Sequence, residues 1–338
     1  CYREGLISTK AAKEDEKSNY EMYYDYSEVV SRIPSHRILA INRGEKEEVL
    51  KVKIDKNEEK ILSDRSVFLE IWQNKDILLV FTGVRFMYFD THCHLNSEQL
   101  YENRDEFIKH ALDNQVEMMV VVGYDLESSK KAVEIAKEYD FIYAAVGIGP
   151  NDCLNTTTQD LQIIDEYLNE PKVVALGEIG LDYYWDDVPS DKQKEIFQLQ
   201  VDLAKKHQKP IIIHCRDAYE DTYEVLKKNG HPGIMHCYSG SVEMAKRFID
   251  LGFYISLAGP VTFKNARVPK DVAEKIGLEH LLIETDCPYL TPHPYRGSLN
   301  EPANVVYIAQ EIAKLKNMEI ESVASQTTFN AKKIFGIK

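Results

Sequence analysis

Long apolar runs are missing from this chain of 338 residues. No apolar run reaches the roughly 18 residues that a membrane-spanning helix requires. The longest candidate, at 76–89, is broken by Gly83 and Arg85, and it is too short and wrongly flanked for an export signal. We therefore expect a cytoplasmic protein, with no indication of a membrane partner or of an obligate protein partner.

Cysteine is scarce as well. Six cysteines, at positions 1, 93, 153, 215, 237 and 287, are too few for a disulfide scaffold in a chain of this length. They form no Cys-x-x-Cys pair, which is the usual mark of a zinc–thiolate site. We expect reduced thiols.

Positive charge is also in deficit, with a formal net charge of −14. Residues 1–86 hold 15 Lys and Arg against 16 Asp and Glu, which leaves 26 against 39, a net charge of −13, for residues 87–338. An acidic surface repels the phosphate backbone of duplex DNA. Any phosphate chemistry in this chain therefore needs cations that are held locally.

Short β-branched runs alternate with amphipathic segments from Met87 onward. The helical segments include 125–140, 190–207 and 241–252, with apolar residues at three- and four-residue spacing. Eight strands, each followed by a helical segment, predict an α/β protein of the (β/α)8 TIM-barrel type. A doubly wound sheet is the alternative, but the glycine-rich phosphate loop typical of it is absent. The eight runs are 86–92, 116–123, 141–148, 173–180, 210–215, 233–238, 253–259 and 281–286.

Residues 1–86 do not continue this rhythm. The segment 16–54 resembles an internal piece of the Tex-type transcription accessory proteins, which are nucleic-acid-binding scaffolds; the resemblance lies in Tyr20–Tyr26 and Ile33–Glu47. We expect two parts, an N-terminal extension at 1–86 and a barrel domain at 87–338. Our hypothesis is that 1–86 is a fused remnant and that Met87 is the natural start, and the alternative is a genuine accessory module.

Histidines and carboxylates occur at the ends of the predicted strands. In a barrel, the carboxyl ends of the strands converge on one face, where several strands together build the active site. Two side chains in a His-x-His pair on a strand point the same way, about 6.6 Å apart along the backbone, and can close on one ion. A divalent metal is the partner that such a set of buried groups shares. The six residues are His92, His94, Glu178, His214, His236 and Asp286.

Four cysteines adjoin these residues and are alternative ligands. Strand neighbours point to opposite faces, so Cys215 and Cys237 are predicted to face the helices if His214 and His236 face the mouth of the barrel. Cys93 and Cys287, which also adjoin predicted ligands, are then packing residues like the other two.

Five motifs in order closely resemble the TatD family of metal-dependent deoxyribonucleases: FDTHCHLN, GEIGLDYY, PIIIHCRDAYE, MHCYSG and IETDCPYLTPHPYRGSLNEP. The resemblance runs from Met87 to Lys338. It implies a TIM barrel with two divalent metal ions and hydrolysis of DNA phosphodiesters, often from the 3′ end of single strands. It places His92, His94 and Asp286 on one ion, His214 and His236 on the other, and Glu178 between them. Zn²⁺, Mg²⁺ and Mn²⁺ all remain open.

The predicted metal site suggests a role for each of its carboxylates and for the polar residues near it. Asp286 is expected to orient the attacking water and accept its proton, and Glu178 to hold both metals. Arg296 is a candidate phosphate clamp, with a salt bridge to an acidic neighbour as the alternative. Three residues beside the ligands are expected to bind the DNA substrate or to support the ligands: Asp182, Arg216 and Tyr238.

The sequence departs from the family pattern at Gly149. The family usually has Gly-Ile-His-Pro where this chain has Gly-Ile-Gly-Pro, so one imidazole at the mouth is missing. We expect metal binding to be retained and nuclease activity to be reduced or altered. Two other functions stay open: a different amidohydrolase-like activity on esters or amides, and a nucleic-acid-binding scaffold with little catalysis.

Overall fold

The computed structural model describes residues 6–12, 18–29, 35–47, 49–55 and 87–337. The chain divides into two compact units, Cys1–Arg85 and Phe86–Lys338. Cys1 and the junction at 56–86, including the expected boundary before Met87, lie outside the described residues.

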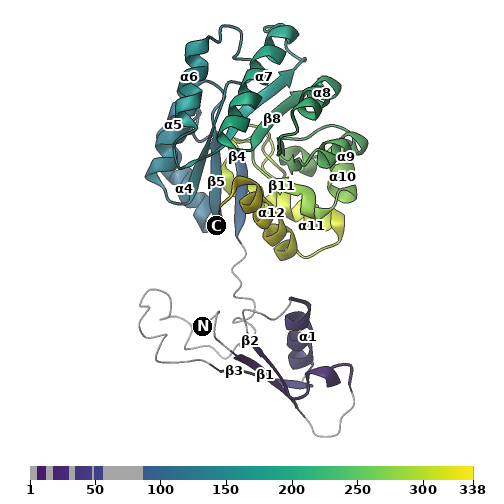
Figure 1. Cartoon of the computed structure of the whole chain (residues 1–338). Helices are drawn as coiled ribbons and strands as arrows, with labels where there is room; N and C mark the ends of the chain where they lie inside the picture. Colours follow the sequence, from purple (N-terminus) through teal and green to yellow (C-terminus); the bar gives the residue numbers. More distant parts are fainter. Residues whose placement is uncertain (1–5, 13–17, 30–34, 48, 56–86, 338) are drawn as a thin grey trace. The chain divides into compact units, whose positions relative to one another are not determined.

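The smaller unit is a three-stranded antiparallel sheet with one helix (Figure 1). Its strand order is β2-β1-β3, and Ile7, Tyr23, Ile41 and Leu50 are buried together between the sheet and the helix. The elements are β1 (Leu6–Ala11), the 3-10 turn η1 (Glu21–Tyr23), β2 (Tyr26–Val29), α1 (Ser35–Lys46) and β3 (Leu50–Asp55).

The larger unit contains one sheet of eight parallel strands that pair in chain order, from β4 to β11. Between the first and the last strand, Asp286 N–H donates to the His92 carbonyl and His94 N–H donates to the Cys287 carbonyl, both at 2.9 Å, so the ring is nearly closed. The strands are β4 (Tyr88–Cys93), β5 (Val116–Val122), β6 (Ile142–Val146), β7 (Val173–Asp182), β8 (Ile211–Arg216), β9 (Gly233–Met235), β10 (Tyr254–Leu257) and β11 (Leu281–Ile283).

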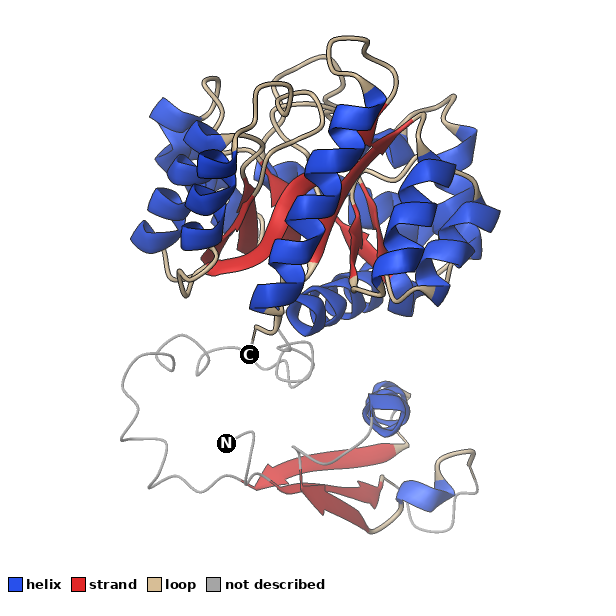
Figure 2. Ribbon diagram, turned by 45° about the horizontal axis from the view of Figure 1, so that its top comes forward, coloured by secondary structure: helices blue, strands red, loops and turns tan. Residues whose placement is uncertain are grey.

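Helices surround these strands, and the loops that follow the strands gather at one end of the barrel, the upper end in Figure 2. The helices are α4 (Arg104–Asp113), α5 (Leu126–Glu138), α6 (Thr158–Tyr167), α7 (Ser190–His207), α8 (Tyr219–Asn229), α9 (Val242–Asp250), α10 (Arg267–Lys275), α11 (Val305–Lys316) and α12 (Ile320–Phe335), with 3-10 turns η2 (Tyr101–Asn103), η3 (Gly259–Thr262), η4 (Leu278–His280) and η5 (Pro302–Asn304). The expected (β/α)8 barrel is confirmed.

Side-chain alternation divides the apolar residues of the strands into two separate clusters. Val121 belongs to the larger cluster, which also contains buried residues of the surrounding helices, whereas its neighbours Val120 and Val122 belong to a smaller one with Phe89 and Phe335. Phe335 ends α12, so this helix contributes to the smaller cluster together with the strands. The polar residues of the strand ends then lie beyond this apolar filling, at the mouth.

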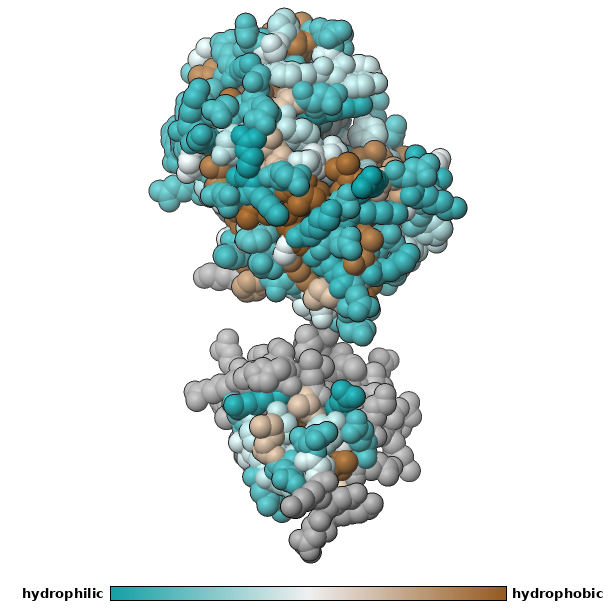
Figure 3. Space-filling view, turned by 90° about the vertical axis from the view of Figure 1, so that its right-hand side faces the viewer, coloured by the Kyte–Doolittle hydropathy of each residue, from teal (hydrophilic) through white to brown (hydrophobic). Residues whose placement is uncertain are grey.

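The outer surface of the larger unit is mainly hydrophilic in the face shown in Figure 3, with smaller hydrophobic patches between the polar residues. Among the described residues, no helix is long and apolar enough to cross a membrane.

Candidate metal centre

All six predicted ligand residues lie at the carboxyl-terminal end of the barrel; five of them form two candidate sets, and the sixth, His214, belongs to neither set but contacts Glu178 at 2.7 Å. Two sets of three could each hold a metal ion, because their donor atoms lie within 4.8 Å of one another. His92 belongs to both sets, so the two candidate positions adjoin. The sets are His92, His94 and Asp286, and His92, Glu178 and His236.

His92 and His94 come from β4 and the residue that follows it, and their Nε2 atoms are 3.1 Å apart. His94 Nδ1 lies 2.9 Å from the Val122 carbonyl, which only accepts, so this nitrogen carries a proton and Nε2 is the ring nitrogen directed at the cluster. His92 is buried, and its Nδ1 has no hydrogen-bond partner among the described residues. Two ring nitrogens this close repel each other unless a proton or a cation lies between them, which suits a metal site.

Glu178 lies inside β7, four residues before the strand ends, rather than at the strand end as expected. The pairing of β7 with β8 is irregular between Leu176 and Ile179, and the Glu178 N–H donates past β6 to the carbonyl of Gly123, the residue after β5, at 2.7 Å. This irregularity brings the Glu178 carboxylate among the imidazoles of the site. A sequence pattern of alternating residues gives no sign of such a shift.

The Glu178 carboxylate is the centre of the cluster. Its oxygens lie 2.7 Å from His214 Nδ1, 3.3 Å from His236 Nε2 and 3.5 Å from His92 Nε2. Burial raises the pKa of this carboxyl, but the imidazoles of His236, His214 and His92 outweigh burial and hold it well below its usual range. Glu178 is therefore a charged oxygen donor placed between the two candidate positions.

His236 directly follows the short strand β9, and a residue that the sequence analysis missed fixes its orientation. Its Nδ1 donates to Glu284 Oε1 at 2.9 Å, which directs Nε2 at Glu178, 3.3 Å away. Glu284 is buried and also accepts from the Cys237 N–H at 2.6 Å and from Ser256 Oγ at 2.5 Å. In the sequence, the one feature that pointed to a role for Glu284 was its position two residues before Asp286. A carboxylate so close to the site is a candidate partner for a histidine ligand, because carboxylates commonly orient such ligands.

His214 lies in β8 between two carboxylates. Its Nδ1 is 2.7 Å from Glu178 Oε1 and its Nε2 is 2.9 Å from Asp182 Oδ2. Burial lowers the pKa of this imidazole, but hydrogen bonds to Asp182 and Glu178 outweigh burial and raise it to about 9. Asp182 is buried and supports a ligand candidate, which favours the supporting role over substrate contact.

Asp286 follows β11 and completes the set with His92 and His94. Its Oδ1 lies 3.5 Å from His94 Nε2 and 3.8 Å from His92 Nε2. Burial raises the pKa of this carboxyl, but the hydrogen bond from His94 and the charges of His236 and His92 lower it overall. The carboxylate is thus held ionised, the form that binds a cation or accepts a proton.

The remaining predicted residues have unlike surroundings. Tyr238 is buried, and its hydroxyl donates to the Ser241 carbonyl at 2.7 Å, so this hydroxyl is engaged within the fold. The Arg216 guanidinium lies 3.6 Å above the centre of the Tyr184 ring. Arg296 lies 4.1 Å from the Phe263 ring centre, and it forms no ion pair with a carboxylate of residues 87–337.

Cys93 and Cys215 pack away from the ligand cluster, as strand alternation predicts for Cys215, whereas Cys237 lies beyond the end of β9, where burial and the Asp286 and Glu284 carboxylates raise the pKa of its thiol. Cys93 Sγ lies 3.4 Å from the Val120 carbonyl, and Cys215 Sγ lies 3.3 Å from Thr222 Oγ1 on α8. All five described cysteines are free thiols. Imidazoles and carboxylates therefore make up the donor set, which suits Zn²⁺, Mn²⁺ or Mg²⁺.

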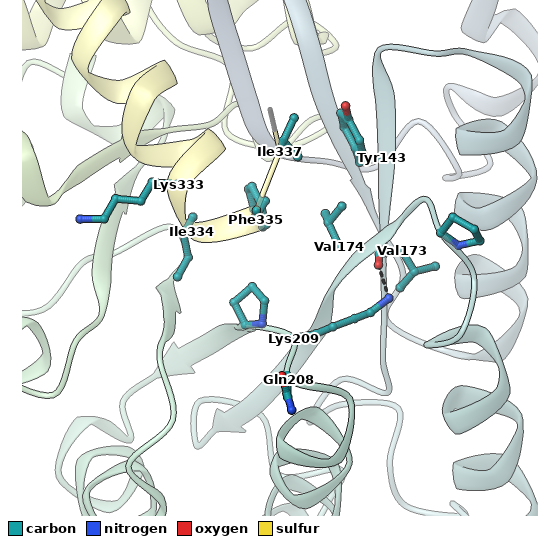
Figure 4. Close-up of a pocket in the computed structure, with 12 residues that line it drawn as sticks. Tyr143, Val173, Val174, Gln208, Lys209, Lys333, Ile334, Phe335 and Ile337 are labelled. Atoms are coloured by element: carbon teal, nitrogen blue, oxygen red, sulfur yellow. Dashed lines mark hydrogen bonds between the residues drawn. The ribbon is translucent and has the colours of Figure 1, made fainter.

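A pocket of about 500 Å³ lies at the other end of the barrel, where β6, β7 and β8 begin and α12 ends. Figure 4 shows Lys209 reaching across it to donate to the Val173 carbonyl, beside apolar residues such as Phe335 and Ile337. It brings together no group of carboxylates or imidazoles, so the chemistry of the described residues concentrates at the mouth.

The family described as TatD related DNase matches residues 89–336. This chain belongs to that family. It is 52% identical to an uncharacterized metal-dependent hydrolase, YabD of Bacillus subtilis, over 254 residues, which cover 74% of this chain and 100% of YabD. It is 35% identical to another uncharacterized metal-dependent hydrolase, YcfH of Escherichia coli K12, over 73% of this chain and 95% of YcfH.

A solved structure supports the same assignment. The crystal structure of YJJV, a TatD homologue from Escherichia coli K12, aligns with a TM-score of 0.72 and 27% identity over 75% of this chain and 100% of YJJV. Residues 1–75 match a different family, described as Tex central region-like. The TatD-type chain is thus a metal-dependent hydrolase with an additional N-terminal segment of Tex-like sequence.

Proposed function

We propose that this TatD-type hydrolase uses two divalent metal ions to hydrolyse phosphodiester bonds of DNA, acting from the 3′ end of single strands. The observation that carries the proposal is the pair of adjoining three-residue sets that share His92, with the Glu178 carboxylate between imidazoles of both sides. His92, His94 and Asp286 would hold one ion, His214 and His236 the other, and Glu178 both. The family name, with its reference to DNA, supports the choice of substrate.

The residues divide the work of such a reaction. A pair of divalent ions would stabilise the charge on the attacking and leaving oxygens of a phosphodiester and lower the pKa of water. Asp286 Oδ1, kept ionised by the imidazoles around it, would orient the attacking water and take its proton. Glu284 and the Val122 carbonyl hold His236 and His94 with Nε2 directed at the cluster. Arg296 and Arg216, both outside ion pairs of the described residues, are available for phosphate oxygens.

The test uses the full chain with Mg²⁺, Mn²⁺ or Zn²⁺ on single-stranded DNA, duplex DNA, RNA and a panel of carboxylic esters. We expect release of nucleotides from the 3′ end of single-stranded DNA, and loss of this activity in Asp286→Asn and Glu178→Gln. Elemental analysis should find two metal ions per chain. Hydrolysis of esters but not DNA would instead support another amidohydrolase-like activity, and DNA binding without hydrolysis at saturating metal would support a scaffold.

A further inference from the structure

Exposed aromatic side chains lie on two opposite sides of the metal centre. Tyr184 and Trp185 follow β7, and Tyr289 follows β11. The strand order places β7 and β11 four positions apart in a ring of eight, so the loops that follow them face each other across the mouth. Tyr184 is 52% exposed, Trp185 50% and Tyr289 54%, which leaves much of each ring open to solvent.

The β7 side is tied directly to the ligand cluster. The Tyr184 N–H donates to Asp182 Oδ1 at 2.9 Å, and the other oxygen of Asp182 holds His214. The Trp185 ring meets the Tyr184 ring edge-on, with ring centres 4.8 Å apart. Arg216, two residues after His214, lies on the Tyr184 ring and within 5.9 Å of the Trp185 ring centre. Two open rings and an unpaired cation are therefore fixed beside one candidate metal position.

The β11 side adjoins the other candidate position. The Tyr289 ring centre lies 6.5 Å from that of His94, and Tyr289 is three residues from Asp286. Its backbone is held because its N–H donates to the Asp286 carbonyl at 3.0 Å and its own carbonyl accepts from Asn300 Nδ2 at 2.6 Å. The ring is thus presented to solvent from an anchored loop.

We infer that these two aromatic groups bind unpaired nucleobases of a single DNA strand that crosses the mouth, one base on the Trp185 side and one on the Tyr289 side. This inference rests on the proposed DNA hydrolysis, and it assigns the preference for single-stranded over duplex DNA to these aromatic side chains. Stacking on aromatic rings requires bases whose faces are free, which a single strand offers and a duplex does not. Arg216 adds a cation for the phosphate between them.

The charge of the chain supports this mode of binding. With a net charge of −13 on residues 87–338, attraction of the DNA backbone over a wide surface is unfavourable. Stacking depends little on net charge, so it supplies affinity that the acidic surface does not. Arg216 and the metals then act only where the strand passes the site.

The experiment compares wild type with Trp185→Ala, Tyr289→Ala and the double variant, all in the full chain with Mn²⁺. Two strands of about eight nucleotides are used, oligothymidylate and an oligomer of the same length with abasic sites. Dissociation constants come from fluorescence anisotropy, and KM and kcat from nucleotide release. Phe329→Ala is the matched control, because Phe329 is 60% exposed on α12.

We expect each alanine variant to weaken binding and raise KM for oligothymidylate by roughly tenfold, because one stacked base is lost. Trp185→Phe and Tyr289→Phe keep a ring and should retain most of the affinity. Wild type should prefer oligothymidylate over the abasic strand, and the double variant should lose that preference. Melting curves should be unchanged, since these side chains are exposed.

Two results would overturn the inference. One is that wild type binds the two strands with equal affinity. The other is that the alanine variants bind oligothymidylate as tightly as wild type and Phe329→Ala do. A failure of the proposed function is distinguishable from this. If wild type releases no nucleotide from any DNA, the proposed hydrolysis fails, while the anisotropy comparison still decides whether the rings bind bases.

Discussion

Glu284 offers the sharpest test of how this site is built, because one buried carboxylate holds the imidazole of His236 from behind. Its Oε1 accepts from His236 Nδ1 and from the Cys237 N–H, while Oε2 accepts from Ser256 Oγ. Glu284→Gln keeps an acceptor of the same shape but removes the negative charge. Glu284→Ala removes the acceptor altogether.

The two substitutions should differ in stability. Alanine leaves His236 Nδ1 and the Cys237 N–H buried without a partner, at about 1–3 kcal/mol each, or about 2–6 kcal/mol in all. Ser256 can turn toward Thr91 Oγ1, 3.4 Å away, and adds little. Glutamine retains the acceptor for both donors, so Glu284→Gln should melt close to wild type when metal is removed.

Metal affinity should fall in both variants. Loss of a carboxylate behind a histidine ligand typically costs about 10–100-fold in affinity, and we expect glutamine at the lower end and alanine at the upper end. Competition between the protein and a chelator for Mn²⁺ or Zn²⁺ measures this. Glu279→Gln, at an exposed carboxylate on the turn before β11, is the control for the change in net charge. Wild-type metal affinity in a well-folded Glu284→Gln would refute the reasoning.

Three further predictions concern the same site. Gly149→His should fit, since a Cβ there meets its nearest atom, the Tyr124 carbonyl oxygen, at 3.4 Å. We expect this variant to raise turnover on single-stranded DNA by at least about tenfold. Unchanged turnover would show that the side chain at this position takes no part in the reaction. In metal-free protein the fold raises the pKa of His214 from an ordinary 6.5 to about 9. The protonated imidazole therefore stabilises the folded state fully below pH 6.5, and this stabilisation is lost as the pH rises through 9. The melting temperature should fall over that range, and His214→Asn should flatten the profile; an unchanged slope would contradict it. Mn²⁺ at about a hundredfold above its Kd should stabilise the protein by about 2.7 kcal/mol for each ion bound, or about 5.4 kcal/mol for two, over protein in chelator; equal denaturation midpoints would argue against a metal centre.

The sequence predicts the barrel well because its signal is repeated eight times. Each apolar run is followed by an amphipathic helix, and an error of one or two residues at one strand leaves the fold unchanged. The predicted runs at 233–238 and 281–286 proved longer than β9 and β11. His236 and Asp286 therefore lie just beyond their strands, where backbone conformation no longer follows strand alternation.

The sequence predicted which polar residues gather at the mouth, but not the residues that orient them. His92 and His94 follow directly from their spacing on one strand, and the other four candidates follow from their places near strand ends. Glu284 and the inward turn of Glu178 depend on contacts between segments far apart in the chain, which periodicity does not carry. Arg216 was singled out beside a ligand, but its contact with Tyr184 arises from the pairing of Asp182 with Arg216 in neighbouring strands.

Because free thiols lie beside the ligand candidates, the register of the strands decides whether sulfur or nitrogen faces the mouth. Cys93 and Cys215 each lie one residue from a candidate imidazole ligand, turned toward packed backbone or a helix instead of the mouth. A slip of one residue in such a strand would exchange the two faces and present sulfur where nitrogen now stands. The same chain would then offer a soft, thiolate-rich site that favours different metals. The donor atoms that this barrel offers to a metal are in that sense selected by backbone hydrogen bonds, including those that the ligand candidates His92, His94 and Asp286 make themselves.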